Sequence, residues 1–259
     1  MQSLKNKIVF ITGASAGIGE SAAKAFAAQG AKVLFCARRA EKLGKLARTL
    51  EAEHGVPVHF FQLDVRDREA VEKAIAGLRP EWRAIDILVN NAGLSRGLDK
   101  LHQGSVQDWE EMIDANIKGL LYVSRAVIPG MVERGRGHII NIGSIAGREI
   151  YPGGNVYCAT KFVVRALSNG LRLDLCGTPI RVSEIAPGMV ETEFSLVRFH
   201  GDAERAGKVY QGMTALQPGD IADAIVWCAT RPPRVNISEI LIVPTDQAST
   251  TLVNRKQPV

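Results

Sequence analysis

Several features that mark other classes of protein are missing from this chain of 259 residues. No apolar run approaches the ~20 residues that a membrane-spanning helix requires. The first residues lead directly into an apolar stretch, which leaves no room for a secretory signal. The cysteines lack the spacings of metal or redox motifs, so we expect no metal site and reduced, structural thiols in a cytoplasmic protein. The four are Cys36, Cys158, Cys176 and Cys228.

Aromatic residues are also scarce, at 6% of the chain, and the positive charges are not gathered into runs. The formal net charge is +5, but lysines and arginines are interspersed with acids, as in Asp67-Arg68-Glu69. No basic run carries the interleaved aromatics that are typical of nucleic-acid binding. We therefore predict no nucleic-acid partner and no membrane partner, and a general positive field that attracts anionic ligands.

The chain does contain a regular alternation of apolar strands and amphipathic helices. Strands are expected at residues 7–11, 31–36, 58–63, 85–89, 138–142, 180–185 and 237–243. Helices are expected at residues 20–29, 41–54, 69–78, 106–134, 157–176 and 218–230. Repeated βα units imply a parallel sheet with right-handed crossovers. Since no linker or repeat interrupts them, residues 1–259 are predicted to form one α/β domain, a Rossmann-type doubly wound sheet of about seven strands with helices on both faces.

A glycine-rich turn joins the first expected strand to the first expected helix. It runs from Thr12 to Gly19 and includes Gly13 and Gly17. Glycines let the backbone approach a pyrophosphate, and a helix N-terminus supplies free N–H groups with a partial positive charge. The Gly-x-x-x-Gly-x-Gly spacing is one residue wider than the common fingerprint. Its place between a strand and a helix predicts a dinucleotide-binding site.

The end of the second strand distinguishes between the two nicotinamide dinucleotides. An NAD site usually places a carboxylate about 20 residues beyond the glycines, where it binds the ribose 2′-OH. This chain has Ala37 there, followed by Arg38 and Arg39. Guanidinium groups match a 2′-phosphate, so we predict NADP(H) as the cofactor. The alternative is that the two arginines form a solvated entry to the next helix.

Tyr157 and Lys161 lie four residues apart, about one helical turn, so their side chains share a helix face. A free phenol has a pKa near ~10, and a nearby ammonium group should lower it. Such a tyrosine can take a proton from an alcohol or return it to a reduced carbonyl. Ser144 would hydrogen-bond the same substrate oxygen. Taken alone, the pair also fits a chance pattern on an exposed helix.

These motifs occur together in a characteristic order. They are Thr12-Gly13-x-x-x-Gly17-Ile18-Gly19, Asn90-Asn91-Ala92-Gly93, Asn116, Ser144, Tyr157-x-x-x-Lys161 and Pro187-Gly188. The chain resembles the short-chain dehydrogenase/reductase family across essentially its whole length. Longer stretches at 86–94, 137–144, 153–157 and 192–199 make it most similar to the NADP-dependent 3-hydroxy acid dehydrogenases, which include enzymes acting on serine and L-allo-threonine.

The resemblance implies a role for each motif residue. Ser144, Tyr157 and Lys161 would be catalytic, and Asn116 would extend a proton relay from Lys161 to solvent. Asp64 would contact the adenine, although the sequence leaves open that it only caps a loop and that Asn116 is only a polar helix residue. The implied cofactor-binding residues are Gly13, Ser15, Ala16, Gly17, Ile18, Gly19, Arg38, Arg39, Asp64, Val65, Asn91, Ala92, Gly93, Tyr157, Lys161, Pro187, Gly188, Val190 and Thr192.

The carboxylate of a hydroxy acid needs a cation or N–H donors. Arg198 is the first candidate because residues 189–215 look like a mobile lid. Arg148, close after Ser144, is the second, and Ser144 would bind the substrate hydroxyl. The alternative for each arginine is a surface pair with a glutamate. Two further polar residues, Ser95 and Arg96, lie in another loop near the site.

Three functions therefore remain open at the level of sequence. The first is an NADP-dependent dehydrogenase of small 3-hydroxy acids. The second is a reductase of bulkier carbonyls, such as a 3-oxoacyl thioester, a diketone or a xenobiotic ketone. The third is a regulatory protein that binds NADP without turnover. The resemblance also implies a homotetramer, in which the tail at residues 245–259 would either cross to a neighbouring subunit or be disordered.

Overall fold

A computed structural model describes residues 2–256; Met1 and residues 257–259, the end of the predicted tail, lie outside the described residues. Its centre is a seven-stranded sheet in the order β3-β2-β1-β4-β5-β6-β7, with every neighbouring pair parallel. The strands are β1 (Ile8–Thr12), β2 (Lys32–Ala37), β3 (Val58–Gln62), β4 (Ile87–Asn90), β5 (Gly137–Ile142), β6 (Ile180–Pro187) and β7 (Glu239–Ile242). The predicted Rossmann-type fold is confirmed. Because the strand order reverses between β1 and β4, a crevice is expected at that point.

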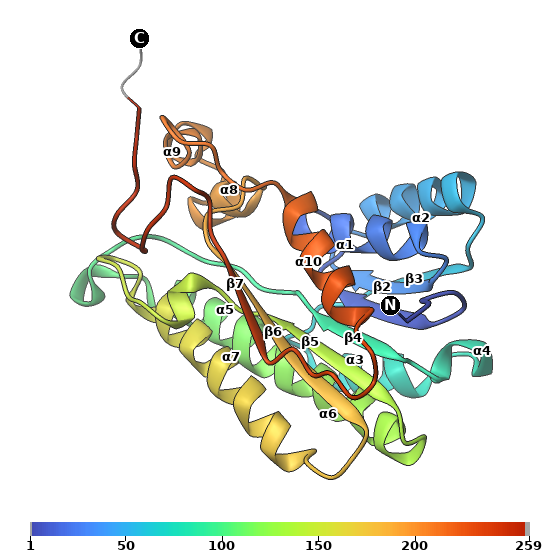
Figure 1. Ribbon diagram of the computed structural model, residues 1–259. Helices are drawn as coiled ribbons and strands as arrows, with labels where there is room; N and C mark the ends of the chain where they lie inside the picture. Colours follow the sequence, from blue (N-terminus) through green and yellow to red (C-terminus); the bar gives the residue numbers. More distant parts are fainter. Residues whose placement is uncertain (1, 257–259) are drawn as a thin grey trace.

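Helices cover both faces of the sheet, with α1, α2 and α10 on one face and α5, α6 and α7 on the other (Figure 1). They are α1 (Gly17–Ala28), α2 (Ala40–His54), α3 (Arg68–Ala76), α4 (Pro80–Arg83), α5 (Val106–Ile113), α6 (Gly119–Glu133), α7 (Asn155–Asp174), α8 (Phe194–Arg198), α9 (Ala203–Lys208) and α10 (Pro218–Ala229). Successive side chains of a strand point to opposite faces. Val9 and Ile11 of β1 therefore pack in one core with Phe26 of α1, while Phe10 packs in the other core with Val127 of α6. A parallel sheet with both faces covered needs such continuous apolar strands.

The long helices expected at residues 106–134 are present and are joined by an irregular turn. The structure has α5, then a π-helical turn (Asp114–Lys118), then α6. Ser105 caps α5 as its sequence position suggests, since its hydroxyl accepts a hydrogen bond from the Asp108 amide. A π-helical turn shifts the backbone hydrogen-bond register without requiring glycine or proline, so its position was not predicted.

The C-terminal segment folds back over its own chain. Arg255 donates to the Val209 carbonyl oxygen at 2.9 Å, and the Lys256 amide donates to the Gly212 carbonyl oxygen at 2.7 Å. The Thr250 amide donates to Glu149. The described part of the tail therefore packs against residues of the segment predicted to be a lid, while its crossing to a neighbouring subunit stays a prediction.

Candidate active site

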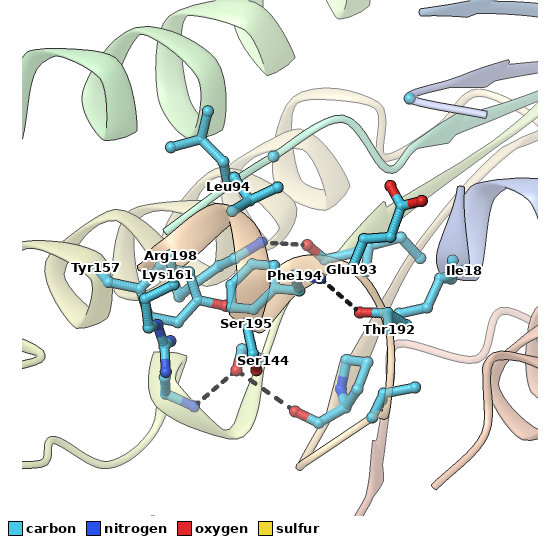
Figure 2. A pocket seen from close by; sticks show the side chains of 18 of the residues that line it. Ile18, Leu94, Ser144, Tyr157, Lys161, Thr192, Glu193, Phe194, Ser195 and Arg198 are labelled. Carbon is cyan, nitrogen blue, oxygen red and sulfur yellow. Dashed lines mark hydrogen bonds between the residues drawn. The ribbon is translucent and has the colours of Figure 1, made fainter. Parts of the chain in front are cut away.

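One cavity of about 710 Å³ lies at the carboxyl ends of the strands and collects nearly every predicted site residue. Figure 2 shows Ser144, Tyr157 and Lys161 on one side of it, with Ile18 and Thr192 on the other. Predicted residues that line the cavity are Gly13, Ser15, Ala16, Gly17, Ile18, Arg38, Arg39, Asp64, Val65, Asn91, Ala92, Gly93, Ser144, Tyr157, Lys161, Pro187, Gly188, Val190, Thr192 and Arg198. Three other predicted residues, Gly19, Asn116 and Arg148, are not among its described lining residues.

The glycine-rich turn has the shape that a pyrophosphate requires. Gly13 has a φ of 70°, and a Cβ there would lie 2.8 Å from the Ala92 Cα atom. A Cβ at Gly19 would lie 2.5 Å from the Gly13 carbonyl oxygen, so Gly19 packs the turn and does not line the cavity. Asn91 donates to the carbonyl oxygens of Thr12 and Gly13 and fixes the turn from β4. Helix α1 starts there without a side-chain cap, which leaves N–H groups for an anion.

At the far end of the cavity, the predicted phosphate-binding arginine lies in a network of charges. Arg39 donates to the Ser15 hydroxyl at 3.0 Å and pairs with Glu193 at 2.6 Å. Lys42 pairs with the other Glu193 oxygen, also at 2.6 Å. Lys42 and Glu193 were not singled out for this site from the sequence, because the lysine belongs to α2 and the glutamate follows β6. Arg38 and Arg39 line the cavity, but both are exposed and Arg39 is the N-cap residue of α2, so they fit the alternative of a solvated helix entry as well.

Asp64 caps a local loop, which is one of the two roles that the sequence left open, and its contact with the adenine stays a prediction. It lines the cavity and also closes a local turn, because its carboxylate accepts hydrogen bonds from the Arg66 amide and side chain. Burial raises the pKa of Asp64, but the hydrogen bonds and charge of Arg66 outweigh it and hold the pKa below its usual range. The carboxylate is therefore ionised at neutral pH.

The proposed catalytic side chains come from the turn after β5 and from one turn of α7. The Ser144 hydroxyl accepts a hydrogen bond from the Ala146 amide at 3.1 Å and donates to the Pro187 carbonyl oxygen at 3.4 Å. Lys161 donates to the Ile142 carbonyl oxygen at 2.9 Å, and its Nζ atom lies 5.9 Å from the centre of the Tyr157 ring. The shared face predicted for Tyr157 and Lys161 is therefore present, and both side chains are buried.

The electrostatic prediction for Tyr157 is wrong in direction. Burial raises its pKa, and the opposing influences come from the Arg198 guanidinium and the Ser144 hydroxyl, not from Lys161. Burial also lowers the pKa of Lys161 to about 8, although the Glu184 carboxylate opposes this fall. The phenol is therefore protonated in this structure, which is the form that donates a proton to a reduced carbonyl.

Asn116 lies in the π-helical turn with its amide fully engaged. Its Oδ1 atom accepts from the Leu94 amide at 2.8 Å, and its Nδ2 atom donates to the Leu94 carbonyl oxygen and the Thr160 hydroxyl. A Cβ at Gly93 would lie 2.9 Å from Oδ1 and 3.8 Å from the Lys161 Nζ atom. Asn116 therefore holds the loop after β4 beneath Lys161. Its role in a proton relay stays a prediction.

Arg198 reaches Tyr157 from helix α8, within the segment predicted to be a lid. Its guanidinium carbon lies 5.4 Å from the centre of the Tyr157 ring. It donates to the Ser95 hydroxyl at 3.1 Å and to the Tyr151 hydroxyl at 3.0 Å, so it does not pair with a glutamate in the described chain. Tyr151 was not predicted as a site residue, because an isolated aromatic residue in a loop carries no motif.

The prediction that Arg148 binds substrate is not supported. Its two terminal nitrogen atoms are committed to Glu184 at 3.2 Å and to Glu239 at 2.8 Å. Arg96, the other loop arginine considered, pairs with Glu111 and donates to the Val197 carbonyl oxygen. Both arginines have structural partners, which leaves Arg198 as the candidate that faces the tyrosine.

Among residues 2–256 there is no cluster of three or more histidine, cysteine or acidic side chains that could hold a metal ion. In the same range no helix has the length and apolar character needed to cross a membrane.

The sheet order, the glycine turn and the Ser144, Tyr157 and Lys161 arrangement define a dinucleotide-dependent oxidoreductase. Residues 7–201 match the short chain dehydrogenase family, and the chain belongs to it. It is 55% identical over 242 residues to the NADP-dependent 3-hydroxy acid dehydrogenase YdfG of Salmonella typhi, covering 93% of this chain and 96% of the relative. It is also 42% identical to the NADP-dependent 3-hydroxy acid dehydrogenase of Schizosaccharomyces pombe. That match covers 99% of this chain and 100% of the relative.

Solved structures agree with this assignment. The chain superposes with a TM-score of 0.90 on the closed form of a serine dehydrogenase complexed with NADP+. The two are 51% identical, and the match covers 96% of this chain and 100% of the other.

Proposed function

We propose that the protein is an NADP-dependent dehydrogenase that oxidises the hydroxyl group of small 3-hydroxy acids such as serine or L-allo-threonine. The observation that carries this proposal is the position of the Arg198 guanidinium, 5.4 Å from the centre of the Tyr157 ring. A cation there could bind the carboxylate of a substrate whose hydroxyl group lies at Tyr157. The names of the most similar relatives support the same substrate class. Bound NADP+ would supply the hydride acceptor, with its pyrophosphate held at the glycine turn and its 2′-phosphate at the Arg38 and Arg39 end of the cavity.

The residues of this chain then perform the proton chemistry. The substrate hydroxyl would lie between Ser144 and Tyr157, so that Ser144 donates to its oxygen and the phenolate of Tyr157 takes its proton. Burial opposes the phenolate, while Arg198 and Ser144 favour it. Lys161, held by the Ile142 carbonyl oxygen, would bind the ribose hydroxyls and keep a positive charge below the tyrosine. In the reverse direction the protonated phenol returns the proton to the carbonyl oxygen.

Aromatic walls favour a small substrate. The Phe194 ring lies edge-on to Tyr157 with the ring centres 5.6 Å apart, and Tyr151 and Tyr210 also line the cavity. A panel assay tests the proposal: purified protein, NADP+, both serine enantiomers, L-allo-threonine and 3-hydroxypropionate, with NADPH followed by absorbance. Turnover of these acids supports it. Silence with the acids, together with NADPH-dependent reduction of bulky ketones, would establish the second function instead. Silence in both, with tight NADPH binding, would favour a regulatory protein.

Replacing Arg198 by methionine should raise KM for the hydroxy acid at least about tenfold, since a charge-assisted hydrogen bond contributes about 1.5–3 kcal/mol. KM for NADP+ should change less than twofold. Arg205→Met is the matched control, because Arg205 lies in α9 over the Phe199 ring and is not among the described lining residues of the cavity. An unchanged KM for the acid in Arg198→Met would exclude Arg198 as the carboxylate partner.

Replacing Arg38 and Arg39 by alanine should raise KM for NADP+ about tenfold to a hundredfold, because guanidinium contacts to a phosphate are charge-assisted. The kcat/KM with NAD+ should stay level or improve. Lys45→Ala is the control, since that lysine of α2 pairs only with Glu41 among the described residues. Equal losses with both dinucleotides would contradict a 2′-phosphate site at these arginines.

A homotetramer in the cytoplasm, as the resemblance implies, stays a prediction. Exposed apolar side chains on α6 and α7, Leu121 and Phe162, fit an interface between copies of the chain. Light scattering after size exclusion tests the assembly, and a monomer would contradict it.

A further inference from the structure

A buried ion pair lies behind the proposed catalytic serine. Glu184, in the middle of β6, has a side chain that is only 1% exposed, and the side chain of its partner Arg148 is 13% exposed. Breaking a buried pair is costly, yet an apolar pair of similar volume is often as stable as the intact one. Stability alone therefore does not account for a glutamate and an arginine at these positions.

The pair lies against the backbone that carries Ser144. The Glu184 carboxylate packs directly on the Cα atom of Gly143, where any larger side chain would collide with it. The same Arg148 nitrogen that pairs with Glu184 also donates to the Ser144 carbonyl oxygen at 3.3 Å. That carbonyl oxygen accepts a further hydrogen bond, from the Gly147 amide, in the turn that follows the serine.

One guanidinium group thus connects the turn after β5 with β6 and β7. Its first nitrogen joins the Ser144 carbonyl oxygen, in the turn after β5, to Glu184 of β6, and its second pairs with Glu239 of β7. Arg148 and Ser144 are only four residues apart, so the hydrogen bond from the planar guanidinium to the Ser144 carbonyl oxygen closes the turn between them. Glu184 also opposes the loss of positive charge at the buried Lys161.

We propose that Arg148 and Glu184 are positioning residues that fix the Ser144 turn in its reactive geometry. This inference rests on the proposed function for the role of Ser144, but the order of the turn is measurable without any substrate. It also gives Arg148 a role different from the substrate binding predicted from its sequence position.

The double variant R148M/E184Q tests the proposal, since removing both charges avoids leaving one charge buried alone. We expect kcat to fall about tenfold, with KM for NADP+ and the Kd of NADPH changed less than twofold. Hydrogen–deuterium exchange on peptides covering residues 143–150, in the NADP+-bound protein, should become faster. E239Q is the matched control, because it removes the outer pair of the same arginine and leaves the Ser144 contact; both measurements should stay at the wild-type level.

Kinetics are compared with the alcohol or ketone that the wild-type protein turns over best. Failure of the hydroxy acid panel therefore affects only the proposed substrate. The positioning role is overturned if residues 143–150 exchange at the wild-type rate in R148M/E184Q, or if E239Q loses as much kcat as the double variant. Faster exchange and lower kcat in the double variant alone support it.

Discussion

Replacing Tyr157 by phenylalanine should lower kcat at least about a hundredfold, because a positioned acid–base group typically contributes 10²–10⁴-fold. The Kd of NADPH should change less than twofold, since the phenol oxygen would act on the substrate and the ring remains in place. Steady-state kinetics of 3-hydroxy acid oxidation measure kcat, and a fluorescence titration with NADPH measures the Kd. The phenyl ring keeps the edge-on contact with Phe194, so the fold should be unaffected.

Tyr210→Phe is the matched control for this experiment. Its hydroxyl group also lies in the cavity wall, where it donates to the Val190 carbonyl oxygen and accepts a hydrogen bond from Ser195. Loss of those contacts should disturb the lid modestly, with kcat within about tenfold of wild type. If Tyr157→Phe retains activity comparable with Tyr210→Phe, the assignment of the acid–base group is wrong.

Replacing Lys161 by methionine should abolish most turnover and yet stabilise the fold at neutral pH. Burial lowers the pKa of Lys161 from the ordinary 10.5 to about 8, so at pH 7 the folded protein holds an ammonium group at a cost of up to about 3 kcal/mol. The hydrogen bond to the Ile142 carbonyl oxygen recovers part of this cost, and the methionine variant loses that bond. The Lys161 ammonium group, which the proposed function requires, thus lowers the stability of the domain.

The sign of the pH dependence follows from the two pKa values. Below about 8 both the folded and the unfolded chain carry the charged lysine, and the full cost is present. Between about 8 and 10.5 the unfolded chain binds more protons, so the stability of the wild-type protein rises with pH relative to the variant. Urea unfolding at pH 7 and pH 9.5 should show the advantage of Lys161→Met shrinking. A variant that is less stable by the same amount at both values would contradict a buried ammonium.

Local sequence predicted the fold and the cofactor end of the cavity well. Gly13 and Gly17 need positive φ, and that requirement is visible in the sequence. The pairing of Arg148 with Glu184 was not predictable, because 36 residues separate them and either arginine or glutamate would look like a surface charge. For the same reason the ion pair between Arg39 and Glu193, which are 154 residues apart, could not be predicted from the sequence. The pKa of Tyr157 was misjudged because burial, which depends on the whole fold, outweighs the neighbour four residues away.

The C-terminal tail attaches to the segment predicted to be a lid through backbone atoms of that segment. Arg255 and the Lys256 amide bind carbonyl oxygens of residues 209–212, and every amino acid presents a carbonyl oxygen. Side chains on this part of the lid can therefore be replaced without loss of its anchor. Gly212, with a φ of 73°, is the exception, since a Cβ there would press on the Lys256 backbone. The tail thus restricts the backbone of residues 209–212 and leaves most of their side chains free to vary.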